Sequence, residues 1–270
     1  MPTKYIGYRQ GDFNTPYAKF YQETIAPIPT AVLAALQSPA LPAGSLPPLS
    51  QVADLQQSGY AAVETGFTLE PDGSARVAVL TSMPKVLPKM WDWWFGWHGS
   101  HADRYKLWHP KMHQHAEWAD GRTDLLSYVG RTSIIEEYIS KDLEKGNIRF
   151  ISPAELGFDS AQAGDKDATV FICARIGYTH WPLDFGWLVH QVRATEDGAE
   201  MRSRFWMGGP HIQVRAKGWI PKILSKMLQK SIRMKENQVK DLLIHCAEEM
   251  NHLAGFLPKL YTEITIKQPD

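Results

Sequence analysis

The C-terminal part of the chain contains a long run, residues 222–254, with neither proline nor glycine. The run follows Pro221, a residue accepted in the first turn of a helix, and stops before Gly255. Its apolar residues recur with a helical period: Ile223, Met227, Leu228, Val239, Leu242, Cys246, Met250 and Leu253. The pattern predicts one long helix from Pro221 to Ala254. Its apolar face must be covered, which constrains how the rest of the chain folds.

The residues before this helix favour antiparallel strands. Residues 67–70 and 74–81 flank Pro71-Asp72-Gly73, a turn sequence that predicts a hairpin. A second hairpin is predicted at 186–194 and 199–207, around the turn containing Glu196-Asp197-Gly198. Further strands are predicted at 127–139, 148–152 and 169–180, and a short helix at 88–96.

Strands followed by one long terminal helix indicate an α+β fold, with a curved antiparallel sheet wrapped around that helix. Such a fold leaves a cavity between sheet and helix. Six prolines exclude a long helix from much of the N-terminal region: Pro27, Pro29, Pro39, Pro42, Pro47 and Pro48. We therefore expect residues 1–60 to form an irregular N-terminal cover with short helical turns, and 61–270 to form the domain that holds the cavity.

Composition excludes several classes of protein. The 29 acidic and 29 basic residues balance, so no global field draws the chain to nucleic acid or to an anionic membrane. The basic residues between Lys217 and Lys240 are interpreted as the solvated face of the terminal helix. Two cysteines in unlike contexts do not suggest a disulfide framework, and the N-terminus does not resemble a signal peptide. We expect a soluble, cytoplasmic protein.

The segment from Trp91 to Trp118 contains six of the ten tryptophans and five of the ten histidines. Large rings exclude water and imidazoles bind metals or transfer protons, so this composition suits the wall of a deep pocket. Composition alone favours the other interpretation, a buried tryptophan core with histidines on the surface. For His113 and His115, in the polar sequence KMHQH, we expect a surface position.

Three further features suggest a metal site. His245 and Glu249 are four residues apart and share a face of the predicted helix. In the strand around Glu136 and Glu137, alternation places one of the two glutamates on the apolar face. His109 precedes Pro110, which favours an extended backbone. One of these glutamates with His109, His245 and Glu249 would make a site with two histidines and two carboxylates, which suits zinc, with Mn²⁺ or Fe²⁺ as alternatives. The alternative is that these polar side chains are exposed to water.

Four segments, in this order, resemble the family of 2,4-diacetylphloroglucinol and phloretin hydrolases. They are RYKLWHP (104–110), GRTSIIEEYI (130–139), RSRFWMG (202–208) and the HxxxE of His245 and Glu249. The resemblance covers roughly residues 80–255. It implies a Bet v 1-like helix-grip fold, a homodimer, and a zinc-dependent hydrolase that cleaves the carbon–carbon bond between an acyl group and a phloroglucinol ring.

The resemblance also implies roles for individual residues. His109, His245 and Glu249 match metal ligands of the family, as does Glu137, with Glu136 as the alternative. His190 matches a pocket histidine needed for activity. The family positions that hold the substrate's oxygens correspond by spacing to His101, Phe205 and Met112, which differ from the family's two tyrosines and asparagine. We expect His190 and His101 to be catalytic, and Tyr105, Met112 and Phe205 to bind substrate.

The expected substrate is a small aromatic ketone, and the expected reaction is a retro-Claisen hydrolysis. The ring's keto tautomer turns the aryl ketone into a β-diketone, so that departing electrons delocalise onto ring oxygens. Zinc would activate water, and His190 or His101 would protonate the ring carbon. Two alternatives remain: a helix-grip carrier of a hydrophobic ligand without enzymatic activity, and a metal enzyme that catalyses another reaction.

Overall fold

The computed structural model describes residues 7–159 and 165–267. Its centre is an antiparallel sheet of nine strands in the order β1-β2-β8-β7-β6-β5-β4-β3, with β9 paired to β7. The strands are β1 (Gly66–Leu69), β2 (Ser74–Pro84), β3 (His113–Trp118), β4 (Thr132–Tyr138), β5 (Leu143–Ile151), β6 (Thr169–Tyr178), β7 (Leu183–Thr195), β8 (Gly198–Gly208) and β9 (Gln213–Val214).

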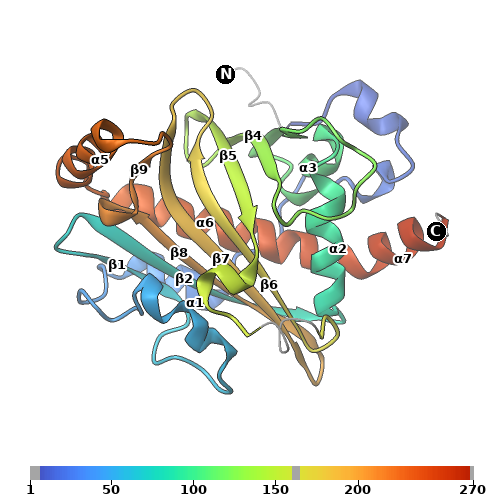
Figure 1. Ribbon diagram of the computed structural model, residues 1–270. Coiled ribbons are helices and arrows are strands. Elements are labelled where there is room, and N and C mark those ends of the chain that lie inside the picture. Colours follow the sequence, from blue (N-terminus) through green and yellow to red (C-terminus); the bar gives the residue numbers. More distant parts are fainter. Residues whose placement is uncertain (1–6, 160–164, 268–270) are drawn as a thin grey trace, which may run out of the picture.

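The helices lie mostly on one face of the sheet and at its ends. They are α1 (Thr30–Gln37), α2 (Pro88–His98), α3 (Ala102–Trp108), α5 (Trp219–Ser231), α6 (Glu236–Ala254) and α7 (Leu257–Lys267). Short 3-10 helices occur at Gln10–Asn14, Ala18–Phe20, Leu49–Gln56, Pro153–Leu156 and Gly209–His211. The curved sheet wraps around α6, which confirms the predicted α+β fold (Figure 1).

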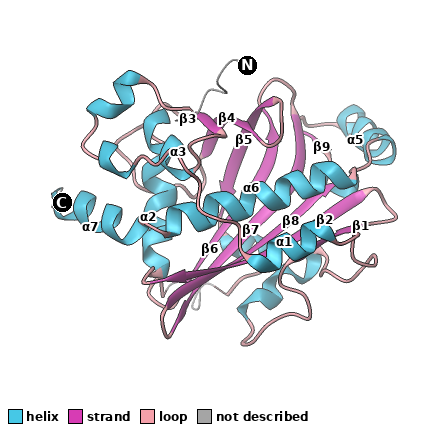
Figure 2. Cartoon of the chain, turned by 180° about the vertical axis from the view of Figure 1, so that it is seen from behind, coloured by secondary structure: helices cyan, strands magenta, loops and turns pink. Residues whose placement is uncertain are grey.

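Helix α6 lies across the concave face of the sheet because one of its sides is almost entirely apolar (Figure 2). Val239, Leu243, Cys246, Met250 and Leu253 on this side are fully buried. They join a core cluster that also contains the tryptophans of α2 and inward-facing residues of β2 and β8. The interpretation of these tryptophans as core residues is correct, and burying such large rings is a major source of stability.

The prediction of one continuous helix from Pro221 to Ala254 is wrong. The chain leaves the helix at Ile232, which has an extended backbone, and enters α6 at Glu236. Tertiary hydrogen bonds explain the break. The backbone N–H of Met234 donates to the carbonyl of Gly73, and Arg233 donates to the carbonyl of Pro71. The turn between β1 and β2 therefore replaces the helical hydrogen bonds of this segment.

Both predicted hairpins are confirmed by the β1–β2 and β7–β8 pairings. The elements that were not predicted include α3, α7, β9 and β3, which lies at the edge of the sheet. The N-terminal region packs on both faces of the sheet, since Phe20 and Val32 join the main core and Val52 and Leu55 join a second cluster. The expected division at residue 60 stays a prediction, and its ranges include residues 1–6, 160–164 and 268–270, which lie outside the described chain.

Candidate active site

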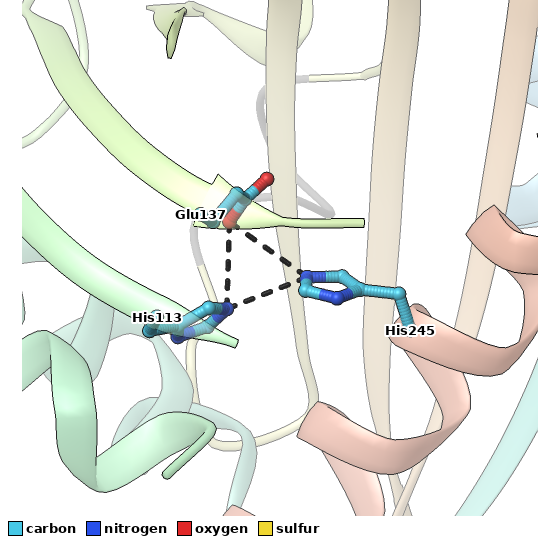
Figure 3. Close-up of side chains that lie close together, drawn as sticks. All are labelled: His113, Glu137 and His245. Atoms are coloured by element: carbon cyan, nitrogen blue, oxygen red, sulfur yellow. Dashed lines mark hydrogen bonds and ion pairs between the residues drawn. The ribbon is translucent and has the colours of Figure 1, made fainter. Parts of the chain in front are cut away.

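Three side chains from distant parts of the chain meet between the sheet edge and α6. His113 comes from β3, Glu137 from β4 and His245 from α6 (Figure 3). The Nε2 atoms of His113 and His245 are 3.4 Å apart, and Glu137 Oε2 lies 3.4 Å from the first and 3.7 Å from the second. These are the separations expected between neighbouring ligands of a tetrahedral zinc ion, roughly 3.3 Å for bonds of about 2 Å.

Glu249 supplies a fourth ligand atom beside this cluster. It follows His245 by one helical turn, so both side chains leave the same face of α6. Its Oε2 lies 3.5 Å from Nε2 of His113 and 3.9 Å from Nε2 of His245. Glu249 thus lies beside both histidines, whereas His113, Glu137 and His245 form the group whose ligand atoms all lie within 4.8 Å of one another. All four side chains are buried.

The strand pair β3–β4 brings His113 to Glu137. In the antiparallel ladder these two residues are direct partners, and side chains of direct partners stand next to each other. Alternation along β4 puts Ile135 and Glu137 on the buried face and turns Glu136 outward. Glu136 pairs there with Lys145 at 2.5 Å. One glutamate of the pair therefore shares the apolar face, as predicted, and it is Glu137.

Tyr105, in α3, holds two members of the cluster. Its hydroxyl donates to Glu137. Its carbonyl oxygen lies 3.1 Å from Nδ1 of His113, and because a carbonyl only accepts, Nδ1 must carry the proton. The Nε2 lone pair of His113 then faces the cluster. This support of a ligating histidine through its second nitrogen is typical of metal sites.

Burial and mutual charge shift the pKa values of these groups strongly. Burial raises the pKa of Glu249 to about 8. Burial would lower the pKa of His245, but the neighbouring Glu137 outweighs it and raises this pKa to about 9. For Glu137 the same interaction outweighs burial, and its pKa is lowered. The pKa of His113 falls well below its ordinary value because of burial and the nearby charge of His245.

These shifts show that the cluster needs positive charge. Two carboxylates cannot both stay ionised in an apolar interior without a cation, and here a proton on His245 partly supplies it. A divalent cation fulfils this need with neutral imidazole and carboxylate ligands. The donor set and the distances fit zinc.

Glu137, His245 and Glu249 line a cavity of about 410 Å³, within the usual range for small-molecule sites. Phe95, Ile135, Phe205 and other apolar residues make up most of its wall. His98 and His190 also line it. Polar residues also line it, among them Lys145, Asn237, Gln238 and Asp241. The cavity can therefore enclose an apolar ring system that carries polar groups.

Comparison with known proteins identifies the family. The model of the DAPG hydrolase PhiG domain matches residues 46–262. The chain belongs to this family. Phloretin hydrolase of Eubacterium ramulus is 29% identical over 272 aligned residues, covering 96% of this chain and 93% of that protein. The 2,4-diacetylphloroglucinol hydrolase of Pseudomonas protegens is 28% identical, covering 93% and 85%. Among solved structures, norcoclaurine synthase from Thalictrum flavum aligns with a TM-score of 0.35 at 12% identity, covering 77% of this chain and 95% of that one.

Membership of the DAPG hydrolase family confirms the predicted resemblance and the expectation of a hydrolase. Within this family member, the structure brings together three of the expected ligands: Glu137, His245 and Glu249. It does not bring His109 among them. Nε2 of His109 lies 3.1 Å from Oε2 of Glu248, and its ring stacks on that of His245 with centroids 5.4 Å apart.

In the structure, His113 rather than His109 lies beside Glu137, His245 and Glu249. The expectation that His113 lies on the surface is wrong, because its side chain is completely buried. The polar neighbours in KMHQH concealed it. Alternation could not have found it, because His113 and Ala116 are both buried while His115 is partly exposed, on either side of a register irregularity.

The other predicted residues divide into two groups. His190, Phe205 and Tyr105 line the cavity, and His190 accepts or donates a hydrogen bond with the Ser203 hydroxyl at 2.8 Å. His101 and Met112 do not line it. His101 precedes the first residue of α3 and is exposed, and Met112 lies in the turn before β3. These positions do not support a catalytic role for His101 or substrate binding by Met112.

Proposed function

We propose that the protein is a zinc-dependent hydrolase that cleaves the carbon–carbon bond between an acyl group and a phloroglucinol-type ring. The observation that carries the proposal is the buried cluster of two histidines and two carboxylates beside an aromatic-lined cavity. Phloretin and 2,4-diacetylphloroglucinol, the compounds that name two relatives, are both acylphloroglucinols.

The ligands proposed for zinc are His113, Glu137, His245 and Glu249. A zinc ion held by them would supply Lewis acidity, polarising a carbonyl oxygen and lowering the pKa of water. The protein's own residues do the rest. Tyr105 keeps Glu137 and His113 in position, and its hydroxyl is engaged with Glu137 rather than with substrate. The walls around the cluster exclude bulk water, which strengthens electrostatic interactions there.

We assign His190 to the substrate ring. Burial lowers the pKa of His190 to about 3, so its imidazole is neutral at physiological pH. A neutral ring with one nitrogen on Ser203 can present the other to a ring oxygen as a hydrogen-bond partner. Negative charge develops on the phloroglucinol oxygens as the bond breaks, and a fixed hydrogen bond there stabilises it. Phe205, whose ring packs edge to face against His190, would contact the phloroglucinol ring of the substrate.

The overall reaction adds water across the bond. The acyl carbon gains the water oxygen and becomes a carboxylic acid, and the ring carbon gains a proton.

A cytoplasmic location and a homodimer belong to the same proposal. Sedimentation of the purified protein at several concentrations measures the oligomeric state directly.

The decisive experiment incubates the zinc-loaded protein separately with phloretin and with 2,4-diacetylphloroglucinol. We expect chromatography to show a carboxylic acid together with the deacylated phenol, from one or both compounds. Labelled oxygen from water should enter the acid, and no dioxygen should be consumed. A chelator should stop the reaction and zinc should restore it.

Two results would contradict the proposal. Tight binding of both compounds without any product, and no effect of the chelator on binding, would make the protein a carrier. Product formation that consumes dioxygen would make it an oxygenase that uses the same cluster.

A further inference from the structure

Helix α5 presents its apolar side chains to solvent. Residues Ile220, Ile223, Leu224 and Met227 follow the i, i+3, i+4, i+7 spacing that forms one stripe on a helix. Their exposed fractions are 61%, 51%, 44% and 61%, and Trp219 at the start of the helix is 71% exposed. Within α5, only Ser225 is buried. The apolar stripe therefore faces away from the rest of the protein.

The contacts of α5 with the protein are polar and lie on its opposite side. The Ser225 hydroxyl accepts a hydrogen bond from the backbone of Val214, and the Gln229 amide donates to the carbonyl of Ile212. These bonds attach the helix beside β9, at the end of the molecule farthest from α7 (Figure 1). The orientation of α5 is thus fixed by polar bonds, with the apolar stripe left uncovered.

The helix and its flanks are strongly basic, although the whole chain is neutral. Residues 217–235 contain Lys217, Lys222, Lys226, Lys230, Arg233 and Lys235, and no acidic residue. In the part of the chain that the structure describes, no ion pair involves the three lysines within α5. On a helical wheel these lysines lie along one border of the apolar stripe. The net charge of zero conceals this local cluster, whose residues were interpreted from the sequence as the solvated face of the helix.

We propose that α5 docks the protein on an anionic lipid surface, with its apolar stripe inserted among the lipids and its lysines at the headgroups. A basic helix with Trp, Ile, Leu and Met on its other face has the composition of helices that lie in the membrane interface. The charge complementarity selects this occupant. A two-fold dimer formed through this stripe would place α5 against itself, and two basic clusters without acidic partners would repel each other.

This docking surface is connected to the cavity. Met234, three residues beyond the end of α5, lines the cavity, and so does Asn237 in the first turn of α6. No helix among the described residues is long and apolar enough to span a membrane, so the contact proposed is peripheral. This contact would place the part of the cavity near Met234 and Asn237 next to the membrane, from which hydrophobic compounds could enter.

The test is co-sedimentation of the full-length protein with vesicles of phosphatidylcholine, either alone or containing phosphatidylglycerol. We expect binding only to the vesicles with phosphatidylglycerol, and weaker binding at high salt. Replacing Lys222, Lys226 and Lys230 by Gln should lower the partition coefficient roughly 100-fold, from about 1 kcal/mol for each lysine. The double variant Ile223→Glu, Met227→Glu should bind no better than wild type binds to phosphatidylcholine alone.

Leu126→Glu is the matched control, since Leu126 is 58% exposed in the loop between β3 and β4. It should bind vesicles as wild type does. Circular dichroism and the melting temperature verify that each variant is folded. Equal vesicle binding by wild type and the double variant would overturn the proposal. So would a wild-type dimer that the double variant dissociates, or binding of wild type to polyglutamate but not to vesicles, which would assign the stripe to a second copy or to an acidic protein.

Discussion

Tyr105 lies flat on His113, with ring centroids 3.8 Å apart and ring planes within 4° of each other. The hydroxyl of the same tyrosine donates a hydrogen bond to Glu137, and its carbonyl accepts a hydrogen bond from Nδ1–H of His113. One residue thus orients two of the four side chains proposed to bind zinc. Such supporting contacts fix the direction of the ligand lone pairs before the metal arrives.

Tyr105→Phe separates these contacts, because it keeps the stacked ring and the carbonyl but removes the hydroxyl. We expect zinc affinity to fall about tenfold, the lower end for loss of a supporting contact. Competition with a chromogenic chelator measures it. Tyr128→Phe is the control, since it also removes a buried hydroxyl, the one bonded to Asp92. Unchanged affinity in Tyr105→Phe would mean that the hydroxyl does not position Glu137.

His113→Ala and His109→Ala distinguish the two candidate histidine ligands. The His113→Ala variant should contain much less than one zinc ion per chain, because it keeps only three of the four proposed ligands and only one imidazole. Loss of His109 should leave the zinc content at one ion per chain, since Nε2 of His109 pairs with Glu248. Elemental analysis of the purified, dialysed proteins gives both numbers. A zinc-free His109→Ala together with a zinc-loaded His113→Ala would reverse the assignment.

The adjacent glutamates form a second matched pair. Glu137→Gln removes a buried anion from the cluster and should reduce zinc binding and turnover by at least 100-fold. Glu136→Gln breaks only a partly exposed pair with Lys145, which contributes at most about 1 kcal/mol to stability. Its turnover should equal that of wild type. Titration calorimetry with zinc and steady-state rates are the readouts, and equal defects in both variants would refute the register deduced for β4.

His190 allows a test by pH. Its pKa is about 3 in the folded protein, because of burial, and close to 6.5 in the unfolded chain. Below pH 6.5, His190 is therefore protonated in the unfolded chain but stays neutral in the folded protein. The free energy of unfolding should fall by up to about 1.4 kcal/mol for each pH unit between these values. His190→Gln should reduce this slope, measured by urea unfolding at several pH values; an unchanged slope would place the histidine pKa near its ordinary value.

Gly96 should not tolerate a side chain, although it lies inside α2. A Cβ at this position would stand 1.6 Å from the carbonyl oxygen of Leu126, which is a backbone atom and cannot move aside alone. Alanine normally favours a helix by about 1 kcal/mol over glycine. Here we expect Gly96→Ala to destabilise the fold by about 2 kcal/mol or more, seen as a lower melting temperature. Gly11→Ala, with no atom within 4 Å, is the control and should melt as wild type does.

Local patterns predicted much of the fold, because strand alternation and turn chemistry depend on a few neighbouring residues. The hairpin around Pro71-Asp72-Gly73 formed as expected. So did the inward position of one glutamate in β4 and the common face of His245 and Glu249. These follow from the periods of two and 3.6 residues, which the sequence displays directly.

What the sequence alone determined is therefore the two hairpins and the buried faces of β4 and α6. Tertiary structure decided the rest. Met234 and Arg233 donate hydrogen bonds to the carbonyls of Gly73 and Pro71, which lie more than 150 positions away along the chain. These bonds interrupt the predicted terminal helix. The choice of His113 over His109 depends on the pairing of β3 with β4, which sets His113 opposite Glu137. Contacts of this kind are selected by the packing of whole elements, and no local period encodes them.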